Sequence, residues 1–177
     1  MNNKKYRQYF GILMALVSYY LVHEGAHFLY AIIAGVFKQI NIVNIIGVQI
    51  DVYREQMSDT MLGEFCLMGP IATFIVSWIL ILSTSWFCKS DNKGFLAAMH
   101  YITIVMMFLD PLYLSVLYRF VGGGDMNGIA LLFPEMAVSI VSGLIFLLNI
   151  FIFAKKILPS YKNAFKRNIE GTKSTKQ

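Results

Sequence analysis

The sequence predicts an all-α polytopic membrane protein with about four transmembrane helices and a small membrane-embedded β-hairpin after the first helix. Of the 177 residues, 57% are apolar and 14% are charged, whereas soluble domains have about 45–50% apolar and about 25% charged residues. The mean hydropathy is +0.60. This apolar surplus is larger than a water-soluble interior holds, and it excludes intrinsic disorder outside the ends. Lipid is therefore the expected solvent for most of the chain.

Four stretches are long enough to cross the hydrocarbon core, which takes about 20 apolar residues in a helix. They cover residues 10–37, 61–87, 95–118 and 130–154. The first stretch is too long for a cleaved signal peptide, and no small-residue cleavage site follows it. The sequence therefore predicts a multi-pass integral membrane protein.

Two connections between these stretches have a pattern of their own. Residues 38–58 alternate Ile and Val with polar residues, which is a strand period, and Gly47 offers a turn. Because lipid supplies no hydrogen bonds, such a ribbon must pair its own backbone. We expect a small hairpin there, packed on the helices or lying at the interface. Residues 122–128 are rich in glycine, which allows backbone and the Asp125 carboxylate to approach another element closely.

The net charge is +5, and the basic residues gather at the two ends of the chain. Three of the 15 precede residue 8 and seven follow residue 154. Lysines beside apolar spans are typical of cytoplasmic segments that face anionic lipid, so this pattern does not indicate nucleic-acid binding. We expect both termini in the cytoplasm, a single domain over residues 1–158 and a mobile basic tail over residues 159–177. The two cysteines form no paired CxxC motif, so the sequence supports neither a disulfide framework nor a thiolate zinc site.

The sharpest motif is His23-Glu24-Gly25-Ala26-His27 in the first apolar stretch. Side chains four residues apart share one face of a helix, so the two imidazoles can occupy two corners of a tetrahedral zinc site. Glu24 could take a proton from a water molecule that zinc activates. The alternative is that these residues only hydrogen-bond to neighbouring helices, although ionisable groups inside a membrane typically mark functional sites. We predict one Zn²⁺ per chain, with Glu24 as general base.

A hydrolytic zinc site needs a third protein ligand, and two aspartates are candidates. Asp125 is favoured because its glycine-rich segment is permissive. Asp110, which precedes Pro111 in the third stretch, is the alternative ligand or a residue that lines the cavity. His100 is expected to be a hydrogen-bonded interior histidine and not a ligand.

The chain resembles the site-2 protease family of intramembrane zinc metalloproteases. The resemblance covers most of residues 11–135, in the family's order: HEGAH, then AGVF and the strand-like ribbon, then GPIA at residues 69–72, then the aspartate-containing glycine run. It implies that His23, His27 and Asp125 bind zinc and that Glu24 is the catalytic base. Two residues separate Asp125 from Gly128, where the family has Asp followed directly by Gly, and Thr73 stands where the family commonly has Asn. Residues that could hold the substrate carbonyl are Asn127, Asn41 and Asn44.

The resemblance implies regulated intramembrane proteolysis: a metalloprotease that cleaves a peptide bond within or next to a transmembrane segment of a substrate protein or peptide, in a bacterial cell membrane. Substrate selection would come from the bilayer-embedded part or from a regulatory membrane partner. The alternatives are a catalytically silent zinc-binding regulator and a structural membrane subunit. In bacterial members of the family the active site is expected to open to the cytoplasm, whereas the charge pattern places the 38–58 ribbon on the other side.

Overall fold

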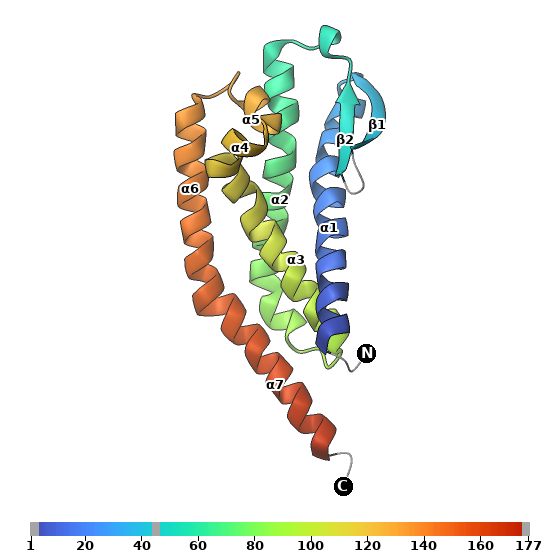
Figure 1. Ribbon diagram of the computed structural model, residues 1–177, viewed down its shortest axis with the longest axis vertical. Coiled ribbons are helices and arrows are strands. Elements are labelled where there is room, and N and C mark those ends of the chain that lie inside the picture. The colour runs from blue at the N-terminus through green and yellow to red at the C-terminus, as the bar shows by residue number, and fades with distance from the viewer. Residues whose placement is uncertain (1–3, 44–46, 175–177) are drawn as a thin grey trace.

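The computed structural model describes residues 4–43 and 47–174. In this part of the chain, four long apolar helices are each able to cross a membrane, and they stand side by side (Figure 1). The candidate spans are Lys4–Ile33, Asp59–Phe87, Lys93–Val121 and Glu135–Arg167. The predicted fold class, with its small hairpin after the first helix, is confirmed.

Several of these spans contain more than one helical element. Helices α1 (Lys4–Ile33) and α2 (Asp59–Phe87) are continuous. Helix α3 (Lys93–Leu112) continues through a π-helical turn, η2 (Tyr113–Leu117), into the short α4 (Tyr118–Val121). The short α5 (Gly124–Ile129) precedes α6 (Glu135–Ile152), a second π-helical turn η3 (Phe153–Ile157) and α7 (Leu158–Ser174).

The hairpin consists of β1 (Phe37–Val43) and β2 (Gly47–Val52), which pair antiparallel with Ile40 opposite Ile50. It lies beside the carboxyl-terminal part of α1 (Figure 1). Ile50 is only 6% exposed, whereas Ile40 on the partner strand is 55% exposed. A short 3-10 turn, η1 (Arg54–Gln56), then leads to α2.

Polar caps set the starts of α2 and α3. The Ser58 hydroxyl accepts a hydrogen bond from the Met61 N–H at 3.1 Å, and the Asn92 side chain accepts from the N–H groups of Gly94 and Phe95 at 2.9 and 3.1 Å. Such caps satisfy amide groups that have no partner inside the helix. Only residues 88–92 separate α2 from α3, so the two helices run antiparallel as neighbours.

Proline in α3 explains a contact that ties α6 to the bundle. Pro111 has no N–H, so the Met107 carbonyl four residues earlier loses its helical partner. The buried Asn149 side chain of α6 donates to this carbonyl instead. The π-helical turn η2 follows directly, as is common where a helical hydrogen-bond ladder is interrupted.

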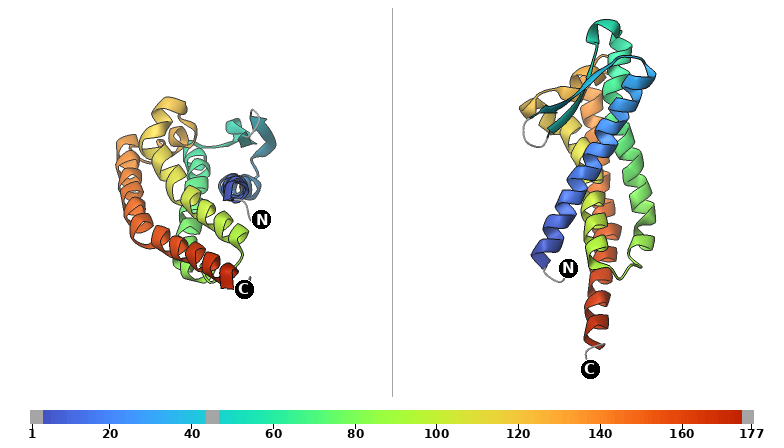
Figure 2. Two further views of the ribbon diagram at one scale, coloured as in Figure 1. Left: turned by 60° about the horizontal axis from the view of Figure 1, so that its bottom comes forward. Right: turned by 90° about the vertical axis from the view of Figure 1, so that its right-hand side faces the viewer.

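Most of the expected basic tail, residues 159–177, lies within the described part of the chain, which ends at residue 174. It is helical through Ser174, and Tyr161 and Ala164 are buried together with Ile157. These three residues follow helical spacing, which gives α7 an apolar face that packs near the start of α3. The first turns of α1 and the body of α7 lie at the end of the bundle opposite the hairpin (Figures 1 and 2).

Candidate metal centre

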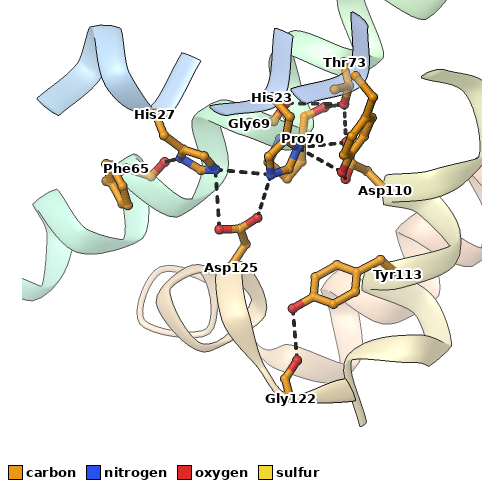
Figure 3. A network of polar contacts seen from close by, with 11 residues as sticks. His23, His27, Phe65, Gly69, Pro70, Thr73, Asp110, Tyr113, Gly122 and Asp125 are labelled. Carbon is orange, nitrogen blue, oxygen red and sulfur yellow. Dashed lines mark hydrogen bonds and ion pairs between the residues drawn. The ribbon is translucent and has the colours of Figure 1, made fainter. Parts of the chain in front are cut away.

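Two histidines of α1 and one aspartate of α5 meet in a buried cluster (Figure 3). His23 and His27 are 6% and 3% exposed, and their Nε2 atoms lie 3.3 Å apart. The Asp125 carboxylate reaches both rings, with Oδ2 at 3.0 Å from His23 Nε2 and Oδ1 at 3.5 Å from His27 Nε2. The structure therefore brings together the three residues that the sequence suggested as ligands.

The other nitrogen of each ring has a partner that orients it. His27 Nδ1 lies 2.7 Å from the Phe65 carbonyl oxygen, which can only accept, so Nδ1 carries the proton. His23 Nδ1 lies 3.3 Å from Asp110 Oδ2. A neutral ring that donates through Nδ1 presents the lone pair of Nε2. Partners of this kind typically orient metal-binding histidines.

Asp110 of α3 lies behind His23 and not in the cluster itself (Figure 3). Its carboxylate accepts hydrogen bonds from the Tyr19 hydroxyl at 2.5 Å and from the Thr73 hydroxyl, and Asp110 is only 3% exposed. It also lines a cavity of about 380 Å³ between α2, α3, α5 and α6. The sequence suggested that Asp110 is either an alternative metal ligand or a residue that lines the cavity. In the structure Asp110 lines a cavity and is not part of the cluster.

The two imidazole nitrogens have the spacing that a metal ion requires, and the carboxylate lies close to both. A tetrahedral ion with bonds of about 2.0–2.1 Å places its ligand atoms about 3.3 Å apart. The two Nε2 atoms are 3.3 Å apart, and one ligand atom from each of the three residues lies within 4.8 Å of the other two. Lone pairs and a carboxylate that face one another at such distances repel unless a cation or proton lies among them. His23, His27 and Asp125 therefore form a cluster that can bind a metal.

Helix α2 backs the cluster with a residue that has no side chain. A Cβ atom at Gly69 would lie 2.5 Å from His27 Nε2 and 2.7 Å from His23 Nε2. Any larger residue would occupy the space of the imidazole nitrogens. In the Gly-Pro motif, Gly69 is thus a residue without a side chain where α2 lies against the two histidines of α1.

The glycine-rich segment positions Asp125. Gly122 and Gly124 have φ values of 98° and 33°, which side-chain-bearing residues rarely adopt, and they turn the chain into α5. Tyr113 of η2 donates from its hydroxyl to the Gly122 carbonyl at 3.1 Å. Asp125 lies outside the candidate spans. Burial alone would raise the pKa of its carboxyl, but where His23 and His27 are protonated and donate to it through Nε2, their hydrogen bonds and positive charge outweigh burial and lower that pKa to about 2.

Glu24 is half-buried and faces a different space from the two histidines. It lines a cavity of about 490 Å³ between α1 and the hairpin, together with Gly25, Phe28 and Ile50. Glu24 also interacts electrostatically with both histidines and with Asp125. Glu24 is thus the one carboxylate in the lining of a mostly apolar cavity, and the three cluster residues are not part of that lining.

Two of the three asparagines that were candidates for holding a substrate carbonyl lie in the described part of the chain, and neither forms a hydrogen bond with the cluster there. Asn127 is exposed and its side chain lies over Gly123. Asn41 donates to Asp51 on the neighbouring strand and accepts from Gln39 at 2.9 Å. Asn44 lies outside the described residues.

His100 differs from its expected place as a hydrogen-bonded interior histidine. Its Nδ1 is buried without a hydrogen-bond partner among the described residues. The ring instead packs against Tyr161 and Phe153, with ring centroids at 4.8 and 6.1 Å.

Sequence reasoning missed two tyrosines. Tyr19 donates a hydrogen bond to Asp110, and Tyr113 donates one to the carbonyl of Gly122 in the glycine-rich segment. A signal for Tyr19 was present, because it precedes His23 by four residues and therefore shares its helical face. No local signal marks Tyr113, since its contact with Gly122 forms only when the chain turns back after η2.

Comparisons with known proteins give no family for this chain. Neither a protein-family model, nor a curated protein, nor a solved structure matches it. The resemblance to the site-2 protease family stays a prediction from the sequence. The argument for function rests on the cluster and its surroundings.

Proposed function

We propose that the chain is an intramembrane zinc metalloprotease that hydrolyses a peptide bond within or next to a transmembrane segment of a protein or peptide. The proposal depends above all on the cluster of His23, His27 and Asp125, in which the two Nε2 atoms lie 3.3 Å apart and each faces one oxygen of the carboxylate, at 3.0 and 3.5 Å. Hydrolytic zinc sites commonly use two imidazoles and a carboxylate, and leave a fourth position for water or substrate. The HEGAH motif supplies independent support from the sequence.

The residues around the cluster suit hydrolysis. Zinc, when bound, supplies Lewis acidity, which polarises a carbonyl and lowers the pKa of water. Glu24 removes a proton from the attacking water and delivers it to the leaving amine nitrogen. Asp110 keeps the His23 ring in the tautomer that binds through Nε2. Gly69 leaves the two Nε2 atoms unobstructed.

The cavity beside Glu24 fits an extended apolar peptide. Its lining comes from α1 and from the hairpin residues Ile40, Val48 and Ile50. A substrate helix has to unwind before attack, because its carbonyls are engaged in helical hydrogen bonds. An unwound segment can then pair with a strand edge of the hairpin. We infer that the substrate binds in this cavity as an added strand, in a bacterial cell membrane and with the enzyme's termini in the cytoplasm.

The variant Glu24→Gln tests the proposal, since it keeps the size of the side chain and removes the base. The full chain, reconstituted in liposomes, would be assayed for zinc by elemental analysis. Cleavage would be followed by mass spectrometry on a panel of single-span helical peptides. We expect one zinc ion per chain in both proteins and cleavage only in the wild type. Glu64→Gln is the matched control, because Glu64 is exposed and bonds to Tyr30 on the surface.

Three outcomes would contradict the proposal in different ways. Normal cleavage by Glu24→Gln would remove the assigned role of the base. Stoichiometric zinc without cleavage of any peptide would favour a catalytically silent zinc-binding regulator. A wild-type protein that binds no zinc would indicate a structural membrane subunit.

A further inference from the structure

A second cavity, separate from the one beside Glu24, lies between helices α2, α3 and α6. It is the cavity of about 380 Å³ that Asp110 lines, and none of the three cluster residues is part of its lining. Its α2 wall extends over residues 67–77 and its α6 wall over residues 137–149, which is about 15 Å and about 18 Å of helix. Both helices run along the length of the bundle (Figure 1). The cavity is therefore long and narrow, roughly 5 Å wide for its volume.

This cavity opens on the outer surface of the bundle, between α2 and α6. Ile71 and Phe74 of α2 line it and are exposed, and so is Val141 of α6 on the other side. All three residues lie inside candidate membrane spans. Thirteen of the eighteen lining residues are apolar. In a bilayer the opening thus faces the hydrocarbon core and not water.

Five polar residues line the cavity, and four of them form hydrogen bonds within the protein. The bonds run from Thr73 to Asp110, from Ser77 to the Phe74 carbonyl at 3.0 Å, and from Asn149 to the Met107 carbonyl. The fifth residue, Ser142, is buried in the interior of α6, where a serine hydroxyl can donate to the carbonyl four residues earlier in its own helix. An occupant of this cavity therefore needs no hydrogen-bonding groups.

The width and the chemistry of the cavity exclude most occupants. A further transmembrane helix is about 10 Å across and too wide to enter. An extended peptide would leave its backbone N–H and C=O groups unpaired against apolar walls. A buried water typically makes about three hydrogen bonds, which these walls do not offer. A single unbranched hydrocarbon chain fits the width, and it supplies the dispersion contacts that the lining would otherwise lack.

We propose that one acyl chain of a membrane lipid lies in this cavity, along α2 and α6 and against the Thr73–Asp110 pair. The chain enters from the bilayer through the opening beside Ile71 and Phe74. It fills the space between the two helices and keeps water away from the hydrogen bond between Thr73 and Asp110, which is stronger in dry surroundings. The proposal does not depend on the protease proposal, since neither zinc nor Glu24 takes part in it.

The test uses a phosphatidylcholine that carries a photoactivatable diazirine in the middle of one acyl chain. The full-length protein would be reconstituted in phosphatidylcholine liposomes with this probe, irradiated and mapped by peptide mass spectrometry. Thr73 and Met106 are buried residues that line the cavity, whereas Thr84 and Thr103 are equally buried and do not line it. We expect the first pair to be labelled at least tenfold more than the second, because only a chain inside the cavity reaches the first pair.

Filling the cavity gives a second readout. Ala137→Phe with Ser142→Leu adds apolar side chains to the lining, and Ala154→Phe with Ser85→Leu adds the same side chains at exposed positions outside it. Labelling of the buried cavity residues should fall at least tenfold in the first double variant and stay unchanged in the second. Ser142→Leu alone, should the first double variant not fold, should lower that labelling severalfold.

Three outcomes would overturn the lipid proposal. Equal labelling of the two buried pairs would show that the probe enters the bundle everywhere, and equal labelling in the filled and control variants would show that it does not lie in this cavity. Lining residues without label, together with a dimer that Ala137→Phe dissociates, would show that a second copy of the chain covers the opening.

Discussion

Replacing Gly69 with alanine gives a direct test of the metal cluster, because helix propensity and site geometry predict opposite effects. In a helix interior, alanine is about 1 kcal/mol more favourable than glycine. At this position, however, the added Cβ would lie 2.5 Å from His27 Nε2 and 2.7 Å from His23 Nε2. A carbon and a nitrogen in contact normally stay about 3.5 Å apart. One or both rings must therefore move by most of an ångström.

Such a displacement is large compared with what metal coordination tolerates. Ligand distances in real sites stay within about 0.2 Å of their ideal values. Changes in residues that only orient a ligand already cost about 10–100-fold in metal affinity. We expect Gly69→Ala to lower zinc affinity by about a hundredfold or more, since it moves two ligands at once. The helical circular dichroism of the variant should match that of the wild type.

The measurement is a chelator competition on purified full-length protein in detergent, combined with elemental analysis. Gly143→Ala is the matched control, because Gly143 also lies in a long helix and its added Cβ would meet only Ser115 Cβ, at an ordinary 3.7 Å. That variant should keep the zinc affinity of the wild type. If Gly69→Ala also kept it, the two Nε2 atoms could not both be ligands in the arrangement described here.

Four further predictions follow from the same contacts. Asp125→Ala should abolish stoichiometric zinc binding, whereas Asp110→Ala should retain it at reduced affinity, and elemental analysis of both separates the ligand from the positioning carboxylate. Tyr19→Phe should weaken zinc binding less than Asp110→Ala in chelator competition, because Thr73 still holds Asp110. Asn149→Leu should lower the free energy of unfolding by about 1–3 kcal/mol, measured by denaturant titration, and leave zinc binding unchanged, because the Met107 carbonyl loses its donor. A green fluorescent protein fused to the carboxyl end should fluoresce if that end is cytoplasmic, and an alkaline phosphatase fusion there should be inactive.

Patterns that repeat along the chain predicted the elements of the fold. Four apolar stretches gave the four spans, and the alternation after residue 37 gave the hairpin, since both depend only on the spacing of apolar residues. The segment after residue 158 carries two signals. Composition identified residues 159–177 as polar and basic, but the helical spacing of Ile157, Tyr161 and Ala164 was the stronger signal, and it predicts a packed helix.

The metal cluster could be predicted in part, because its residues have different kinds of signal. His23 and His27 are related by helical spacing, so their meeting follows from local structure alone. Asp125 could be suggested only because glycines around it permit a close approach. Asp110 shows the limit of such reasoning. Whether a carboxylate meets Nε2 or Nδ1 of His23 depends on the packing of α3 against α1, and no spacing rule encodes that choice.

If the chain is the protease proposed above, the position of the cluster along α1 bears on which side of the membrane a substrate would be cut. His27 precedes the end of α1 at Ile33 by six residues, or about 9 Å of helix, whereas Lys4 and Arg7 mark the other end. The cluster is thus inside the bundle but near the end that carries the hairpin (Figure 1). If the basic end is cytoplasmic, water and an unwound substrate would reach Glu24 from the outer face, and the proposed cleavage would take place near that face. The family resemblance implies the opposite orientation, in which the site opens to the cytoplasm. The fusion experiment therefore decides whether the proposed cleavage would take place near the outer or the cytoplasmic face of the membrane.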